Sequence, residues 1–118
     1  MTHPQAGKLP TQGQLVNVDE LLAAYSARTT GLAPVSFGTS GHRGGSLKNS
    51  FNETHILAIT QAICEYRQSA GITGPLYVGI DSHALSKPAL LTCLQVLAAH
   101  KVNAFYQAEF DYTPTPVI

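Results

Sequence analysis

One uninterrupted apolar segment constrains the fold of this chain more than any other feature. Residues 76–81, with the sequence Leu-Tyr-Val-Gly-Ile-Asp, follow Pro75 and are bounded by the polar pair Ser82-His83. A short apolar run without alternation is typical of a strand buried on both faces, and such strands belong to parallel sheets. Because parallel neighbours are joined by a crossover, usually a helix, this strand predicts helices on either side of it.

Two helical patterns flank that strand. The first begins near Ser50, where Ser50-x-x-Glu53 has the form of a capping box, and it ends at Gly71. The second begins with Ser86 as its cap and carries Pro88 in its first turn, where a missing N–H does no harm. The predicted buried stripes are Ile56, Ile59, Ile63 and Tyr66 in the first helix, and Leu90, Leu91, Leu94, Leu97 and Ala98 in the second.

The two ends of the chain are predicted to be less regular. Residues 1–14 are polar and rich in Gly, Pro and Gln, which is typical of a mobile tail. A short helix is expected over residues 20–27, capped by Asn17 or Asp19. Near the other end, residues 112–116 (Tyr-Thr-Pro-Thr-Pro) should be extended, because each proline pushes its predecessor out of helical geometry.

Further strands, expected at residues 35–37 and 102–106, complete an alternation of strand, helix, strand, helix, strand. That order predicts an α/β domain with right-handed crossovers. We therefore expect a three-layer α/β/α domain with a mostly parallel or mixed sheet. Residues 1–34 would form an N-terminal extension with a short helix, and residues 35–118 the domain itself.

Charge and composition argue against several classes of protein. Seven basic residues balance seven acidic ones, so neither nucleic acid nor a membrane surface is an expected partner. No apolar run approaches the roughly 18–20 residues of a membrane span. Cys64 and Cys93 lie in apolar helical patterns, which favours buried thiols over disulfides or metal ligands and makes a cytoplasmic location the expectation. No zinc spacing, and hence no metal site, is predicted from the five histidines, His3, His42, His55, His83 and His100.

The glycine-rich segment at residues 38–45, Gly-Thr-Ser-Gly-His-Arg-Gly-Gly, is the main candidate for chemistry. It belongs to a longer stretch, residues 38–49, that is too polar and glycine-dense for a regular element and is predicted to be a loop. This loop follows a predicted strand, where open α/β sheets collect ligands. Its hydroxyls, its backbone N–H groups and the planar guanidinium of Arg43 are donors suited to phosphate oxygens. The spacing fits neither a Walker loop nor a dinucleotide fingerprint. A phosphate site and a structural glycine turn with a surface arginine both remain open.

A second polar segment, Asp81-Ser82-His83, follows the strand at residues 76–81. A hydrolase triad is excluded, because adjacent residues cannot converge as three triad side chains must. A strand-end turn, in which Asp81 or Ser82 caps backbone groups, is favoured over a catalytic histidine. Glu109 and Asp111 are also expected near strand ends, without evidence that they converge with Asp81.

Four motifs, in order along the chain, resemble the α-D-phosphohexomutase family. Residues 38–44 are similar to its G-T-S-G-x-R-G loop, and residues 50–59, 74–86 and 113–116 resemble the bacterial phosphoglucomutase branch specifically. The matches cover about residues 35 to 116. The resemblance implies domain I of that family, with its three-layer α/β/α architecture.

The resemblance also implies an activity, that of an isomerase acting as an intramolecular phosphotransferase. Family members interconvert glucose 1-phosphate and glucose 6-phosphate through glucose 1,6-bisphosphate and an active-site phosphoserine. Mg²⁺ on an aspartate-rich loop offsets the charge of the transferring group. By motif match, Arg43 would position phosphate, and Thr39, Ser40 and Gly41 would form the phosphate-binding loop around it. No catalytic role is assigned to His42.

Several motifs of the family do not occur among the 118 residues. The catalytic T-x-S-H-N-P serine segment would follow the Thr-Pro-Thr-Pro stretch, and the D-G-D-G-D metal loop would follow further on. We therefore expect this chain to be truncated before the serine segment, to work with the remaining mutase domains on a phosphosugar, and to be inactive alone. The alternatives are a non-catalytic phosphate- or phosphosugar-binding module and a truncated product without function.

Overall fold

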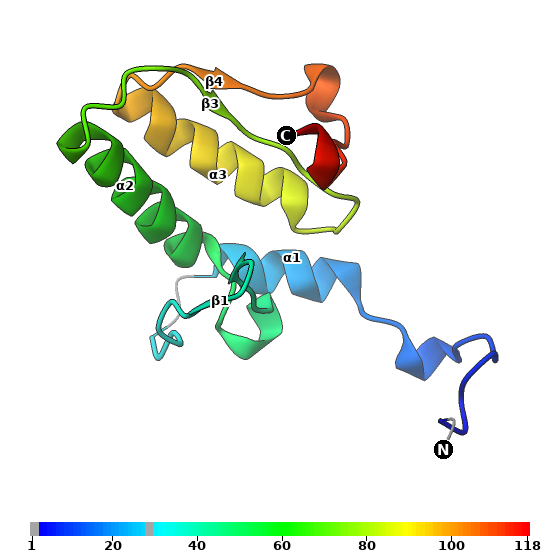
Figure 1. The fold of residues 1–118 in the computed structure, drawn as a ribbon. Coiled ribbons are helices and arrows are strands. Elements are labelled where there is room, and N and C mark those ends of the chain that lie inside the picture. The colour runs from blue at the N-terminus through cyan, green and yellow to red at the C-terminus, as the bar shows by residue number, and fades with distance from the viewer. Residues whose placement is uncertain (1–2, 28–29) are drawn as a thin grey trace.

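Helices account for most of the regular structure in the computed structural model, which describes residues 3–27 and 30–118. They are α1 (Val18–Ser26), α2 (Glu53–Ser69) and α3 (Ser86–Ala99). Helices α2 and α3 pack against each other, and α1 packs against a short 3-10 turn at Ser46–Lys48 (Figure 1). The residues before α1 project away from this body and are exposed from residue 3 to residue 17. Met1, Thr2, Arg28 and Thr29, which belong to the predicted tail and extension, lie outside the described residues.

The strands are short and form two separate pairs. β3 (Leu76–Tyr77) runs parallel to β4 (Ala104–Phe105), with Leu76 opposite Ala104, and α3 is the crossover between them. Two further backbone bonds extend the ladder, from Leu76 N–H to the Asn103 carbonyl and from Val78 N–H to the Phe105 carbonyl. β1 (Phe37–Gly38) and β2 (Gly41–His42) pair antiparallel in a hairpin of their own. The described residues thus confirm the parallel pairing but join no third strand to it.

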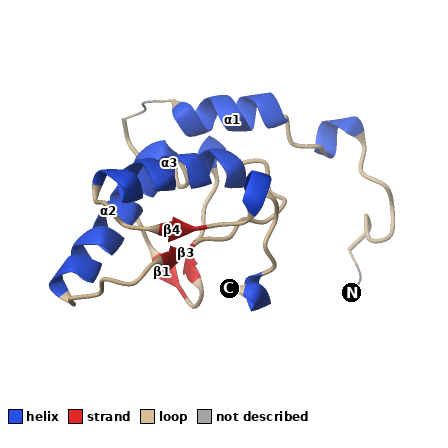
Figure 2. Cartoon of the chain, turned by 90° about the horizontal axis from the view of Figure 1, so that it is seen from above, coloured by secondary structure: helices blue, strands red, loops and turns tan. Residues whose placement is uncertain are grey.

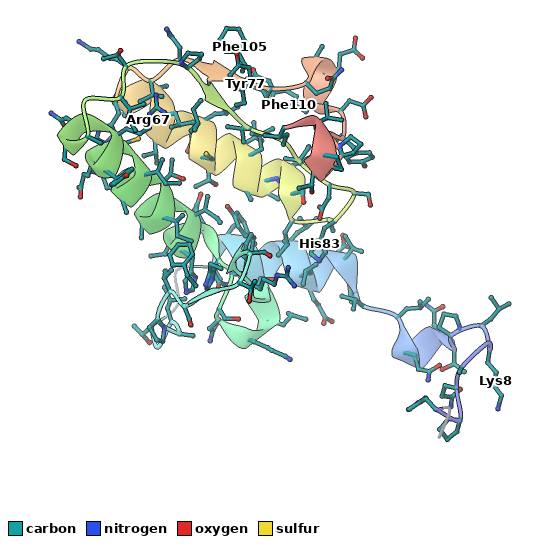
Figure 3. All side chains as sticks on the ribbon, in the orientation of Figure 1. Lys8, Arg67, Tyr77, His83, Phe105 and Phe110 are labelled. Atoms are coloured by element: carbon teal, nitrogen blue, oxygen red, sulfur yellow. The ribbon has the colours of Figure 1, made fainter. Side chains whose placement is uncertain are left out.

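The parallel pair has an open face, so the prediction of a strand buried on both faces is wrong: Tyr77 of β3 is 65% exposed. Helix α3 lies on one side of the pair (Figure 2), whereas Phe105 lies on the side away from α3 (Figure 3). The rings of Tyr77 and Phe105 stack there with centroids 5.5 Å apart, and Phe105 remains 57% exposed. The expected three-layer sandwich is therefore not present among the described residues, which supply no helix to cover these rings.

Helix α1 begins where Asn17 caps it. The Asn17 Oδ1 accepts the backbone N–H groups of Asp19 and Glu20, so of the two predicted caps Asn17 is the one used. Tyr25, only 2% exposed, extends from α1 to the middle of α3, where its hydroxyl lies 2.9 Å from the Thr92 Oγ1. This contact packs a helix of the predicted N-terminal extension against the rest of the fold.

Helix α2 begins at Glu53, and its cap lies two residues beyond the predicted cap, Ser50. Its N-cap is Asn52, whose backbone N–H donates to the Nδ1 of His55. The Asn52 side chain is buried and donates instead to the carbonyls of Ala24 and Ser46, which ties the start of α2 to α1 and the 3-10 turn. The predicted end is confirmed, because Gly71 follows the last turn with φ +67°, a conformation that glycine adopts without strain.

The buried stripes differ from the predicted ones. In α2 the buried residues are His55, Thr60 and Cys64, while Ile63 and Tyr66 of the predicted stripe are exposed. In α3 Leu90 and Leu97 are buried as predicted, but Leu91 and Ala98 are exposed and Thr92 is buried in their place. The reason is packing against distant segments: Thr92 hydrogen-bonds to Tyr25 of α1 and His55 to the Ala33 carbonyl, whereas periodicity alone favours the bulkiest apolar residues.

Three local predictions also need correction. Ser86 does not cap α3, since the N-cap is Leu85 and Ser86 is the first helical residue. The segment at residues 38–49, predicted to be irregular, contains the β1–β2 hairpin and the 3-10 turn. The stretch 112–116 is extended only as far as Pro114, because Thr115–Val117 closes a 3-10 turn.

Candidate functional site: a cationic hollow beside the hairpin

The hairpin loop surrounds one polar hollow. Thr39, Ser40, Gly41 and Arg43 all line a hollow of about 360 Å³, together with Ser36 and Gly38. The loop reverses direction at Gly41, which has φ +114°, a value that L side chains rarely adopt. The residues that the sequence singled out for phosphate binding are therefore neighbours in space.

Arg43 connects this hollow to a second one. A hollow of about 210 Å³ is lined by Arg43, His42 and Gly44 from the hairpin side, and by Asp81, His83 and Ser86 from the turn between β3 and α3. Among the described residues, the Arg43 guanidinium has no hydrogen bond or ion pair. Its five N–H donors are therefore available to a ligand. The two polar segments found in the sequence meet at this arginine.

The Asp81 turn has a fixed geometry. Asp81 Oδ1 accepts the backbone N–H of His83 at 2.9 Å and the hydroxyl of Ser86. The hydroxyl hydrogen bond from Ser86, with a smaller contribution from the His83 N–H, holds the pKa of Asp81 below its ordinary value. The preferred interpretation of this segment as a turn capped by Asp81 is confirmed. Because the Ser86 hydroxyl donates to Asp81, it does not cap α3.

His42 holds the two ends of the loop together. Its Nε2 donates to the Ser50 carbonyl at 2.7 Å, and its Nδ1 lies 3.2 Å from the Ser36 backbone nitrogen. The ring also stacks on His55, with centroids 5.6 Å apart. His42 is thus a structural element of the loop that the sequence did not reveal, because its partners are backbone atoms 6 and 8 residues away.

Other groups that the sequence raised do not form a site. Cys64 is buried and Cys93 half-buried, both as free thiols, and burial raises the pKa of each. Within residues 3–27 and 30–118, no three His, Cys, Asp or Glu side chains converge as metal ligands would. Glu109 and Asp111 are not among the residues that line either hollow. No helix of the described part of the chain has the length and apolarity of a membrane span.

The fold and the loop define a class, and comparison with known proteins identifies it. Residues 34–118 match the family described as phosphoglucomutase/phosphomannomutase, alpha/beta/alpha domain I. The chain belongs to this family, as its motifs predicted. It is also similar to a phosphoglucomutase of Komagataeibacter xylinus, with 57% identity over 119 residues. That alignment covers 98% of this chain but only 21% of the relative, so the chain spans about a fifth of the relative's length.

Proposed function

We propose that this chain is domain I of an enzyme that interconverts glucose 1-phosphate and glucose 6-phosphate through a phosphoserine and glucose 1,6-bisphosphate. In that enzyme its hairpin loop would hold a phosphate group. The observation that carries the proposal is the arrangement of Thr39, Ser40, Gly41 and Arg43 around one polar hollow. Because the chain spans only 21% of its relative, the complete reaction belongs to the longer protein.

The chemistry of the loop suits phosphate. The Arg43 guanidinium presents two parallel N–H donors that match two oxygens of one phosphate, and charge-assisted bonds of this kind are about twice as strong as neutral ones. The hydroxyls of Thr39 and Ser40 can donate to the remaining oxygens. A phosphoryl transfer depends mostly on positioning and on cationic stabilisation, which is the role we assign to Arg43.

The remaining parts of the site would come from outside this chain. The family's phosphoserine segment and its metal loop have no counterpart in the 118 residues. The acidic residues described here do not converge on a metal position, so the residues present do not fit Mg²⁺ and we derive no step through it. We propose the other mutase domains as partners, a phosphosugar as substrate and the cytoplasm as location. In the complete protein a further helical layer would cover the open face of β3 and β4 and complete the α/β/α sandwich.

Titration of the chain with glucose 1-phosphate, followed by ¹H–¹⁵N NMR, tests the proposal. We expect saturable shifts at residues 38–45, and at least a tenfold rise in Kd for Arg43→Ala, because a charge-assisted pair of hydrogen bonds is lost. Arg43→Lys should lie in between, since lysine keeps the charge but not the fork. Lys48→Ala is the matched control, because Lys48 follows the loop but lines neither hollow.

An activity assay separates the proposed function from the alternative of a binding module. The chain alone should not interconvert the two sugar phosphates, whereas the same chain joined to the remaining four fifths of its relative should do so. Measurable turnover by the 118 residues alone would refute the proposed division of the site. Absence of any shift at residues 38–45 would refute phosphate binding by the loop.

A further inference from the structure

His83 lines the hollow that Arg43 enters, and its hydrogen bonds fix the state of its ring. The backbone N–H of Leu85 donates to the His83 Nδ1 at 3.1 Å, so this nitrogen is an acceptor and carries no proton. A neutral imidazole with Nδ1 unprotonated carries its proton on Nε2. The turn therefore leaves His83 with a donor, Nε2–H, that has no hydrogen-bond partner among the described residues.

The surroundings of His83 keep the ring in this place. Its backbone N–H is held by Asp81 Oδ1, and Asp81 is held in turn by Ser86 at the first position of α3. Figure 3 shows His83 in the turn at the end of α3 that is nearer to α1. His83 and Arg43 come from segments 40 positions apart in the sequence, yet both line one hollow of about 210 Å³.

We propose that His83 is a second phosphate-binding residue, which donates from Nε2 to an oxygen of the phosphate that Arg43 holds. This inference rests on the proposed function of the loop and extends the site to the β3–α3 turn. A purely structural role for His83 would need only Nδ1, the atom that accepts from Leu85. His83 lines the same hollow as Arg43 and its Nε2 has no partner within the described chain, and a free N–H donor beside an arginine suits a phosphate ester.

Two substitutions distinguish the role of the His83 Nδ1 from that of its Nε2. His83→Asn keeps an acceptor where Nδ1 lies but removes the donor, whereas His83→Gln can place an amide N–H near the position of Nε2. We expect the Kd for glucose 1-phosphate to rise about tenfold in His83→Asn, because a hydrogen bond to a charged group is lost, and to recover most of that loss in His83→Gln. Inorganic phosphate should show the same ranking and unphosphorylated glucose no binding, if the phosphate is the recognised group.

A spectroscopic readout accompanies the affinities. The ¹⁵N spectrum of the imidazole should show His83 Nδ1 unprotonated before ligand is added, and a shift of Nε2 on addition. If His83→Asn binds as tightly as the wild type, or if His83→Gln is as weak as His83→Asn, the inference is wrong while the Arg43 site stands. If the wild-type chain binds no phosphate ester at all, both the inference and the proposed function fail.

Discussion

Single hydrogen bonds decide which atoms of the candidate site a ligand can reach. Asp81 uses Oδ1 for two internal donors, from His83 and Ser86, and so acts as the anchor of its turn. His83 uses Nδ1 for the Leu85 N–H, and its Nε2 has no hydrogen-bond partner among the described residues. Arg43 makes no internal bond within the described part of the chain. The donors that a ligand can reach are thus the N–H groups of Arg43 and His83 that no internal hydrogen bond of the described residues uses.

The Asp81 anchor makes stability depend on pH. Because its pKa is lowered in the fold, chiefly by the Ser86 hydroxyl, Asp81 contributes stability that is fully present above its ordinary value, about pH 4. That contribution is lost as the pH falls through the lowered value. Ser86→Ala should therefore raise the Asp81 pKa toward its ordinary value and reduce stability at neutral pH, with the difference from wild type vanishing in acid.

The side-chain ¹³C shift of Asp81, followed against pH by NMR, measures this effect directly. Thermal unfolding at pH 7 and at pH 2 measures its consequence for stability, which should be small because Asp81 is exposed. Ser82→Ala is the control, since Ser82 has no side-chain hydrogen bond in the turn as described. An unchanged Asp81 titration in Ser86→Ala would contradict the assignment.

Among the elements, the hairpin depends on backbone contacts more than on side-chain packing. His42 joins its two ends, and the Ser50 hydroxyl accepts the Gly45 N–H at 3.0 Å. Gly44 lies against the Ser50 backbone so closely that a methyl group there would overlap the Ser50 carbonyl. The loop thus has a built conformation even though its strands are only two residues long.

Substituting alanine at each of two adjacent glycines, Gly44 and Gly45, tests the close contact between Gly44 and the Ser50 backbone. Gly44→Ala should displace the segment around Ser50, cost about 2 kcal/mol of unfolding free energy and weaken binding of glucose 1-phosphate. Gly45→Ala should be within about 0.5 kcal/mol of wild type, because a methyl group at that position meets no atom within 4 Å. Chemical denaturation and the NMR titration give the two quantities. Equal effects of the two substitutions would refute the contact.

In the molecule as a whole, the described chain is less compact than its length allows. Its radius of gyration is 16.6 Å, against about 13–14 Å for a compact domain of this size. The N-terminal residues, which project away from the body, contribute to this difference (Figure 1). The body is held together across long sequence distances, and the hydrogen bond between Tyr25 and Thr92 spans 67 positions.

The Tyr25 contact predicts that α1 contributes to the stability of the whole. Tyr25→Phe keeps the ring and removes the hydroxyl, so the free energy of unfolding should fall by about 1 kcal/mol. Tyr66→Phe should have no measurable effect, because Tyr66 is 67% exposed. Denaturant unfolding of both variants checks the difference. Equal stability of the two variants would mean that the hydrogen bond between Tyr25 and Thr92 does not hold α1 against α3.

Some of the fold and the site could be predicted from local sequence, and some could not. Gly71 ends α2 and Asn17 caps α1, because each acts on backbone groups within a few residues. Ser50 and Ser86 also match the pattern of a helix cap, yet neither caps a helix. The Ser50 hydroxyl is hydrogen-bonded to Gly45 and the Ser86 hydroxyl to Asp81. The same limit applies to the site: the loop residues were identifiable, whereas the roles of His42 and His83 depend on partners that the sequence does not indicate.

The sequence by itself determined the family, the parallel direction of the two strands that α3 joins, and the loop that carries Arg43. These follow from motifs and from periodicities of a few residues, which are local properties of the chain. Only the tertiary structure decided that Arg43 and His83 line one hollow, and that α2 buries Thr60 and Cys64 while Ile63 and Tyr66 of the predicted stripe are exposed. Such outcomes depend on which surfaces meet when distant segments pack, and packing is a property of the folded chain.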